Sequence, residues 1–428
     1  IKQIVWTGAA FCVGLFILLL DSRFYHMYAY YAYAGGILML IAVLLFGREV
    51  NGAKAWYSLG SFAVQPVEFT KITVALAVAR LMSNYNYSIK KLGDLVHVGF
   101  IILLPLIIII LQNDTGSGIV LCSFIFVLYR EGLNKWICIP AILVAALFIF
   151  SFLFTPLFLL MILVLIFTFS NAMMIGQWKA HIIFLAAIAL CSFSLFGIST
   201  VFWDEPLSGY ASLAITVIAA AVLAVIFAFR KNISAIFLSV GLFIGSMLFV
   251  PTADKIFESV LQPHQKLRIL SFLGIMSDPR GADYNVNQAK IAIGSGGLFG
   301  KGFMEGTQNR YFVPEKETDF IFCTVGEEWG FLGALFVLGL LCALILRLMK
   351  MGERQEEPFG RIYSYCVASI LLFHVLVNIG MTVGLMPVMG IPLPLLSYGG
   401  SSLVAFTILI FIAIRLDSST EEQERYIY

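Results

Sequence analysis

Long apolar stretches recur along almost the whole chain, and most of the polar segments between them are short. A helix needs about 20 mainly apolar residues to cross the hydrocarbon core of a bilayer. By this measure the pattern predicts thirteen helices, at 4–20, 27–46, 66–82, 98–112, 117–129, 136–153, 155–170, 181–202, 207–229, 233–250, 319–347, 362–384 and 400–416. Several of these are short, and the pair 136–153 and 155–170 also fits a re-entrant hairpin.

The composition agrees with this pattern. Hydrophobic residues make up 60% of the chain and charged residues 12%, whereas a soluble domain carries about 25% charged residues. We therefore predict an all-α polytopic membrane protein in which residues 1–428 form a single integral membrane domain. A net charge of +2 gives no sign of nucleic-acid binding, and we expect no nucleic acid as a partner.

Basic residues gather in one of the two alternating sets of loops. Cytoplasmic loops carry an excess of Lys and Arg, so this set is expected in the cytoplasm; it contains Arg23, Lys90, Lys91, Arg130, Lys135, Lys179, Arg230, Lys231, Lys350, Arg354, Arg361 and Arg425. The long segment 251–318 then faces outward, and so do 47–65, 113–116 and 385–399. The unusual polar residues of the chain lie mainly on this outward side.

The segment 251–318 is the longest polar stretch of the chain. Loops of this length are usually functional or disordered, and this one keeps apolar and aromatic residues throughout, so we expect it to be folded and functional. Asp278 precedes Pro279, a pair typical of extended or turn backbone that can hold a carboxylate outside regular structure. The glycine run 294–302 lacks the spacing of a phosphate-binding loop. It predicts a tight crossing of the backbone over a lipid-linked substrate, or a compact turn.

Two charged residues stand near the start of the predicted helix 66–82. Glu68 and Lys71 are three residues apart, so they share one face of the helix and can form an ion pair. Charges within a membrane span are costly and indicate a functional site by default. A structural ion pair at the mouth of the helix is the alternative.

Two further outward segments carry irregular or polar sequence. Asp114 is expected to cap the N-terminus of the next helix through its side-chain oxygen, with a chemical role second. In 385–402, three prolines and Gly399–Gly400 interrupt the helix. Irregular backbone at membrane depth is either packed within protein or lines a cavity, and both interpretations remain open.

Glu327 and Glu328 stand about eight residues into the predicted helix 319–347. At 1.5 Å per residue they would lie roughly 12 Å inside that helix. Two adjacent carboxylates at this depth need partners, and His374 and Asn378 on the next span are the candidates.

Eight motifs carry a resemblance to a known family. They are GAKAW (52–56), QPVEFTK (65–71), QNDTG (112–116), SDPRGADYNVNQAKIAIGSGG (277–297), GTQ (306–308), FVPEKETDFIF (312–322), GEEWG (326–330) and GMTVGLMPVMGIPLPLLSYGGSS (380–402). In content and order they resemble the SEDS family (shape, elongation, division, sporulation), and within it the rod-shape branch more than the division branch.

The resemblance implies a peptidoglycan glycosyltransferase active in cell elongation. Such an enzyme polymerises lipid II at the outer face of the bacterial cytoplasmic membrane and releases undecaprenyl pyrophosphate. It implies two kinds of partner, a class B penicillin-binding protein and other membrane proteins of the elongation complex. The essential acid of the family falls on Asp278, the expected general base, and its charged pair falls on Glu68 and Lys71.

The resemblance and the charged residues also lead to expectations for substrate contacts and cofactors. We expect substrate binding by Glu68, Lys71, Lys290, Lys301, Asp319 and Ser397. The loop lysines can neutralise phosphates, although a solvated lysine is the simpler interpretation. Asp283 is a possible second carboxylate for the role of base. A divalent cation (Mg²⁺ or Mn²⁺) is compatible with the reaction, but no ligand cluster indicates one.

The chain departs from the family pattern in several places. The family has ten spans with the long loop after the seventh; here we expect the first span to be missing and about four extra helices to lie within 131–250. That even number preserves the outward placement of the loop. Ala55, Asp283 and Glu317 stand where the family often has Arg, Gly and His.

Two other functions remain open. A flippase for lipid II would use intramembrane charges such as Glu68 and Lys71 equally well, but it needs groups accessible from both sides, and inverted internal repeats are not evident. A non-catalytic scaffold of the elongation complex would tolerate alanine at all these polar positions.

Overall fold

The computed structural model describes residues 2–50, 52–59, 62–203, 206–231, 234–260, 262–275, 282–313 and 315–427. This part of the chain is mainly helical, and eight of its helices are long and apolar enough to cross a membrane: Ser22–Phe46, Leu92–Leu111, Pro156–Met173, Trp178–Phe202, Gly209–Arg230, Gly330–Arg354, Pro358–Thr382 and Gly400–Ser419. The prediction of an all-α polytopic membrane protein is confirmed. The count of thirteen crossings is not confirmed, in part because the predicted span 117–129 is divided between two short helices.

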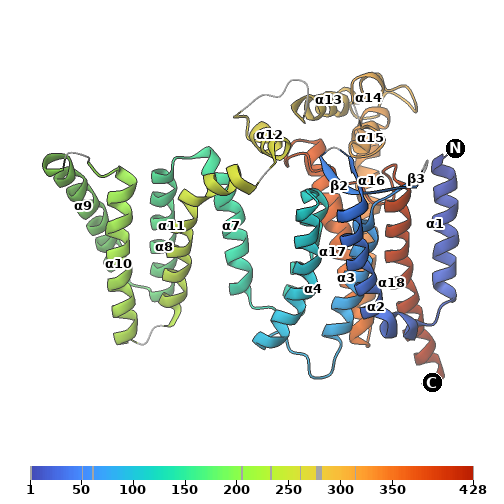
Figure 1. The fold of residues 1–428 in the computed structure, drawn as a ribbon, viewed down its shortest axis with the longest axis horizontal. Coiled ribbons are helices and arrows are strands. Elements are labelled where there is room, and N and C mark those ends of the chain that lie inside the picture. The colour runs from blue at the N-terminus through green and yellow to red at the C-terminus, as the bar shows by residue number, and fades with distance from the viewer. Residues whose placement is uncertain are drawn as a thin grey trace. The chain divides into compact units, whose positions relative to one another are not determined.

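Two compact units divide the chain (Figure 1). Unit 1 comprises Ile1–Asn134 and Leu267–Tyr428, and unit 2 comprises Lys135–Lys266. The membrane-length helices and their neighbours in unit 1 are α1 (Lys2–Leu19), α2 (Ser22–Phe46), α3 (Pro66–Met82), α4 (Leu92–Leu111), α5 (Thr115–Leu121), α6 (Phe124–Arg130), α16 (Gly330–Arg354), α17 (Pro358–Thr382) and α18 (Gly400–Ile427). The expectation of inserted helices within 131–250 stays a prediction.

Unit 2 is built from five helices and has its own apolar core. These are α7 (Lys135–Leu153), α8 (Pro156–Ile175), α9 (Trp178–Phe202), α10 (Gly209–Lys231) and α11 (Ser234–Val260). Leu160, Leu163, Val217 and Met247 pack together in the core of this unit. The helix α12 (Pro263–Phe272) contains the boundary with unit 1.

Helices α3 and α17 form the centre of unit 1. In α17, 78% of the membrane-length window is buried, compared with 17% in α16, so α17 lies inside the bundle and α16 at its periphery. A small residue lets α2 approach α3 closely: a Cβ added at Gly36 would lie 2.6 Å from Thr73 Oγ1. Such small residues are typical of interfaces between membrane helices. The polar residues of α3 and α17 therefore lie within protein.

A small antiparallel sheet between α2 and α3 was not predicted from the sequence. Strands β1 (Arg48–Val50), β2 (Ala53–Leu59) and β3 (Phe62–Val64) pair in the order β1-β2-β3. The Lys54 amide donates to the Gln112 carbonyl at 2.9 Å, which ties the sheet to the end of α4. An Asn-Gly pair at 51–52 is a strong hairpin signal and could have revealed β1 and β2.

The long polar segment is shared between the units: residues 251–266 belong to unit 2, and the residues from 267 on belong to unit 1. It contains α13 (Ala282–Ser295) and α14 (Gln308–Tyr311), and α15 (Ile321–Glu328) follows. Ala289, Ala292, Val313, Phe320 and Cys323 form a separate apolar cluster that packs α13 against α15. Figure 1 shows α13, α14 and α15 at the same end of unit 1 as the strands.

The expectation that Glu327 and Glu328 lie deep inside one long helix is wrong. The helix stops at Glu328 and a new one starts at Gly330, whose φ of +67° is a left-handed conformation that favours glycine. Both glutamates therefore belong to the short helix α15, outside the membrane-length helix α16. Their partners are not His374 and Asn378.

Candidate functional site

The buried pair Glu68 and Lys71 lies at the start of α3. The side chains are 3% and 1% exposed, and Lys71 Nζ lies 2.8 Å from Glu68 Oε2. Proline at the first helical position starts α3 and is well suited to a helix N-terminus. The predicted ion pair is therefore present and fully enclosed.

A third residue, His374 of α17, completes this buried group. Lys71 Nζ lies 2.9 Å from His374 Nε2, and His374 Nδ1 lies 3.0 Å from the Pro392 carbonyl. Nδ1 must carry the proton to donate to a carbonyl, so Nε2 accepts from Lys71 and the imidazole is neutral. Lys71 thus joins α3 to α17, and His374 joins both to the segment 385–399.

The segment 385–399 is packed against α17 and the residues that precede α15. Asn378 Nδ2 donates to the carbonyls of Asp319 at 2.8 Å and Ile391 at 2.7 Å. Ser397 Oγ donates to the Thr318 carbonyl at 2.6 Å and accepts from the Leu393 amide at 2.7 Å. Side chains thereby satisfy backbone groups that the broken helix leaves unpaired, which supports a packed irregular segment.

Asp114 caps α5, as expected, and also accepts a hydrogen bond from Gln65, which lies between β3 and α3. Its Oδ1 accepts from the Ser117 amide at 3.2 Å, and its Oδ2 accepts from Gln65 Nε2 at 2.8 Å. Gly116 then passes so close to the Met389 carbonyl that a Cβ there would collide with it. The segments 47–65, 113–116 and 385–399 and the residues at 317–319 therefore meet at one end of unit 1.

Asp319, an expected substrate-binding carboxylate, lies at this meeting point beside the segment 385–399. A Cβ added at Gly390 would be 3.5 Å from Asp319 Oδ2. Burial, reinforced by Glu315, raises the pKa of Asp319 to about 6, although Arg268 opposes the shift. A carboxyl group with this pKa changes its charge close to neutral pH.

Arg268 of α12 was missed by the sequence analysis. Burial lowers the pKa of its guanidinium, while the charges of Asp319 and Asp114 raise it. Arg268 therefore lies within electrostatic range of two acids from different parts of the chain. Arg268 lies in the segment 251–318, nine residues before the motif 277–297, and no pattern in the sequence links it to Asp114 or Asp319.

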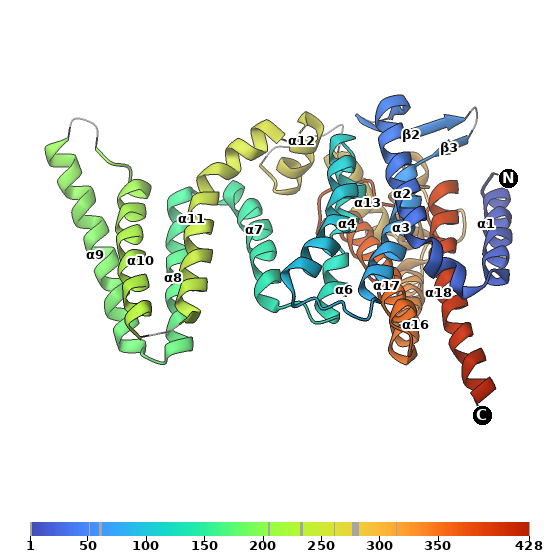
Figure 2. The same ribbon diagram turned by 60° about the horizontal axis from the view of Figure 1, so that its bottom comes forward.

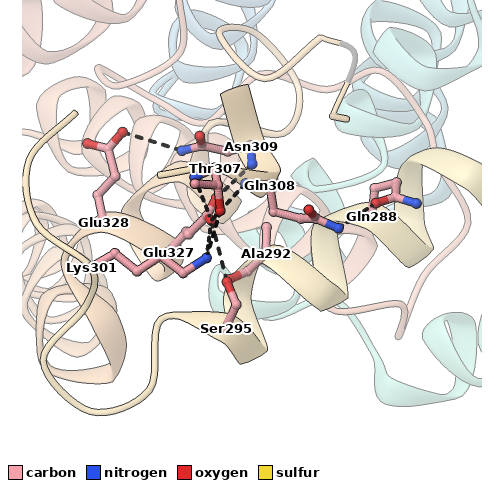
Figure 3. A network of polar contacts seen from close by, with 9 residues as sticks. All are labelled: Gln288, Ala292, Ser295, Lys301, Thr307, Gln308, Asn309, Glu327 and Glu328. Atoms are coloured by element: carbon pink, nitrogen blue, oxygen red, sulfur yellow. Dashed lines mark hydrogen bonds and ion pairs between the residues drawn. The ribbon is translucent and has the colours of Figure 1, made fainter. Parts of the chain in front are cut away.

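Glu327 is the centre of a second polar network (Figure 3). Its carboxylate is fully buried and accepts from Lys301 Nζ at 2.6 Å and from the amides of Thr307 at 3.0 Å, Gln308 at 2.9 Å and Asn309 at 2.6 Å. Burial raises the pKa of Glu327, but Lys301 and the amides of Asn309 and Gln308 outweigh it and hold that pKa below the usual range. The network holds the loop 301–309 against α15, and Lys301 is part of it.

The glycine run 294–302 makes a tight crossing with the backbone of the α15–α16 junction, and the crossing over a substrate stays a prediction. The amides of Lys301 and Gly302 donate to the carbonyls of Glu327 and Glu328, each at 3.0 Å. A Cβ at Gly296 or Gly300 would collide with the backbone at 326–330. The glycines are thus explained by protein packing against the α15–α16 junction.

The remaining predicted site residues lie on or before α13. Lys290 is exposed on α13, and its ammonium group passes over Gly384, beside the segment 385–399. Asp278 lies outside the described residues, and so does the side chain of Asp283. Among the described residues, no group of three or more His, Cys, Asp or Glu could hold a metal ion.

Comparison with known proteins identifies the family. The model of the FtsW/RodA/SpoVE family, described as "Cell cycle protein", matches residues 1–201 and 207–422. The chain belongs to this family. The resemblance to SEDS proteins is thereby confirmed.

Curated members of the family are similar to this chain over most of their length. RodA of Treponema pallidum, named a peptidoglycan glycosyltransferase, is 33% identical over 417 residues, which cover 94% of this chain and 86% of RodA. MrdB of Escherichia coli K12, also named a peptidoglycan glycosyltransferase, is 30% identical over 400 residues, which cover 92% of this chain and 79% of MrdB. Both similarities lie on the rod-shape side of the family.

Solved structures of the family share the fold. One chain comes from a structure described as "Structural coordination of polymerization and crosslinking by a peptidoglycan synthase complex"; it has a TM-score of 0.61, is 24% identical, and the match covers 98% of this chain and 89% of that one. RodA of Thermus thermophilus has a TM-score of 0.54 and is 22% identical, with 98% and 87% covered. At these identities the likeness shows the fold alone.

Proposed function

We propose that this chain polymerises glycan strands from lipid II, as a peptidoglycan glycosyltransferase of cell elongation, with Asp278 as general base. The observation that carries the activity is family membership: relatives of the chain that match over most of their length are named peptidoglycan glycosyltransferases. The assignment of the base rests on the motif around Asp278, SDPRGADYNVNQAK.

The chemistry needs one base and nearby cations. A sugar hydroxyl must lose a proton as the anomeric bond to pyrophosphate breaks, and one carboxylate placed at that hydroxyl can take the proton. Pyrophosphate leaves readily, so a second carboxylic acid of the glycosidase kind is not required. Positive charge that stabilises the departing diphosphate is required.

The geometry supports different roles for the cations, either positioning of the helices or contact with the phosphates. Lys71 is enclosed between Glu68 and His374, so it positions α3, α17 and the segment 385–399. Lys290 is exposed beside that segment and can meet a phosphate directly. Arg268, near Asp319 and Asp114, is a second candidate for this role.

The finer assignments of location and partner are part of the proposal. The multi-pass fold and the relatives support a protein of the bacterial inner membrane. Placement of 251–318 on the outer face is supported by the excess of Lys and Arg in the opposite loops. A class B penicillin-binding protein and other elongation proteins as partners are supported by the similar chain in a peptidoglycan synthase complex.

The decisive experiment is polymerisation of lipid II by the purified full-length chain in nanodiscs, with a class B penicillin-binding protein. We expect Asp278→Ala and Asp278→Asn to lower the rate by about 10²–10⁴-fold, the usual contribution of a general base, with unchanged thermal unfolding. Asp283→Ala is the matched control and is expected to keep activity.

Wild-type activity in Asp278→Ala would overturn the assignment of the base. Loss in Asp283→Ala alone would move that role to Asp283. Transfer of lipid II across vesicles without any polymer, by the wild-type chain, would favour the flippase instead.

A further inference from the structure

Unit 2 contains a cavity that the proposed reaction does not use. Its volume is about 480 Å³, within the range of about 300–1,000 Å³ that is typical of small-molecule sites. Helices α8, α9, α10 and α11 line it, mainly with apolar side chains such as Val164, Phe167, Val217 and Phe243. An occupant of this space must therefore be largely apolar.

The lining of the cavity also contains neutral polar groups, near the end of α8 and the start of α9. Ser239 Oγ donates to Asn171 Oδ1 at 2.9 Å, and Asn171 Nδ2 donates to the Phe167 carbonyl at 2.9 Å. His181 Nδ1 lies 2.9 Å from the Gln177 carbonyl, so it carries a proton and donates, which leaves Nε2 facing outward from that bond. No Asp or Glu is among the described lining residues, so an anion entering here meets no negative charge.

Two cations stand at the same end of unit 2. Lys179 directly precedes the lining residue Ala180, and Arg230 follows the lining residue Phe227 by three positions, on the same face of α10. Both are exposed, and neither has a carboxylate partner in the part of unit 2 that the structure describes. Figure 2 shows the α8–α9 turn and the end of α10 at one end of this unit.

We propose that unit 2 binds an anionic phospholipid, with one acyl chain in the cavity and the headgroup phosphate at Lys179 and Arg230. Basic pockets between membrane helices bind anionic headgroups because the charges attract over the short distance at the membrane surface. The long apolar stems of Lys and Arg let their charged ends reach the headgroup region. The apolar lining separates this site from one for a free phosphate, which has no group to place in the cavity.

The test is photocrosslinking in nanodiscs, on the purified full-length chain. The probe is phosphatidylglycerol with a diazirine in its acyl chain, and the labelled residues are mapped by mass spectrometry. We expect labelling of residues that line the cavity, competed by unlabelled phosphatidylglycerol and not by phosphatidylcholine or inorganic phosphate. Lys179→Gln with Arg230→Gln is expected to weaken binding, and with it labelling below saturation, by about thirtyfold, since each of the two surface charges contributes about 1 kcal/mol.

Two further variants make the result decisive. Lys255→Gln, an exposed lysine on the C-terminal half of α11, is the matched charge control and is expected to keep wild-type labelling. Ala221→Trp fills the cavity and is expected to abolish labelling there, with folding checked by thermal unfolding. Equal competition by phosphatidylcholine, competition by inorganic phosphate, or unchanged labelling in the Lys179 and Arg230 double variant would each overturn the proposal.

Discussion

Lys71 shows how one side chain connects three parts of the molecule. Its side chain is 1% exposed and lies beside three buried residues: Glu68 of α3, His374 of α17 and Phe406 of α18, whose ring centroid is 5.3 Å from Lys71 Nζ. Desolvating a lone charge costs several kcal/mol, and an opposite charge close by must compensate for it. Glu68 and Lys71 therefore stabilise the fold and also hold α3 and α17 in a fixed arrangement.

A double-mutant cycle tests this coupling. Lys71→Met leaves Glu68 buried without a partner, so we expect a loss of about 3–5 kcal/mol in the free energy of unfolding. Glu68→Gln combined with Lys71→Met should recover most of that loss, because no buried charge remains, and yet stay inactive in polymerisation. Thermal unfolding and lipid II turnover in nanodiscs measure both. A double variant as unstable as Lys71→Met would show that the pair is not held by charge.

Asp319 predicts a pH dependence of stability. Its pKa in the fold is about 6, and an Asp in an unfolded chain titrates near about 3.9. Between these values the folded protein binds more protons than the unfolded one, so stability falls as the pH rises. Asp319→Asn removes this loss. We expect the variant to be more stable than the wild type above pH 6, by up to roughly 3 kcal/mol, and equal to it near pH 4.

Thermal unfolding between pH 4 and pH 7.5 tests the expectation for Asp319. Glu315→Gln, which removes the secondary cause of the shift, should give a smaller gain of the same sign. A wild type and an Asp319→Asn variant that keep a constant difference in stability across this pH range would contradict the raised pKa.

At the scale of elements, irregular segments lack regular backbone hydrogen bonds, and side chains on neighbouring helices supply hydrogen bonds in their place. Side chains of α17 hydrogen-bond to the segment 385–399, and Glu327 of α15 hydrogen-bonds to the segment 301–309. In both cases a polar side chain on a helix supplies partners for backbone groups of a loop. Such hydrogen bonds give these loops a defined shape.

Glu327 gives a matched comparison with its neighbour. Glu327 receives three backbone amides and one ammonium group, whereas Glu328 accepts from the Met304 amide at 3.1 Å and from Asn309 Nδ2 at 3.4 Å. Hydrogen bonds to a charged group contribute about 1.5–3 kcal/mol each. We expect Glu327→Gln to speed amide hydrogen exchange at 307–309 by at least tenfold, and Glu328→Gln to change it little. Equal effects of the two variants would contradict the network.

At the scale of the whole molecule, the two ends of unit 1 differ in character. One end carries the sheet, α13–α15 and the segment 385–399 (Figure 1). Helices α6, α16, α17 and α18 and the residue after α6 carry the ion pairs of the other end: Arg130 with Glu353, Arg361 with Glu131, and Arg354 with Asp417. This asymmetry is the basis for the proposed orientation.

Cysteine labelling in intact cells tests the orientation. In a variant without the native cysteines, Glu305→Cys on the long segment should react with a membrane-impermeant maleimide. Lys90→Cys should react only after the cells are permeabilised. Both positions are exposed, so access and not burial decides the result. The reverse pattern would place the proposed catalytic loop in the cytoplasm and exclude polymerisation at the outer face.

Much of this architecture was readable from the order of residues alone. The apolar runs placed helix at every predicted span, because a membrane helix must carry a long unbroken apolar sequence to satisfy the hydrocarbon core. Local rules also sufficed for the Glu68–Lys71 pair and the Asp114 cap. These features depend on residues a few positions apart, which helix geometry brings together without reference to the rest of the fold.

Contacts between distant segments needed the tertiary structure. Glu327 was expected to pair with His374 and Asn378, but its partners lie 18 to 26 residues upstream, because Gly330 ends one helix and starts another. His374 contacts Lys71, which is 303 positions away in the sequence. The charges of Asp319 and Asp114 act on Arg268, which is distant from both in the sequence. Such pairings arise from how helices pack, and packing depends on the complementary shapes of many side chains, which hydrophobic periodicity does not encode.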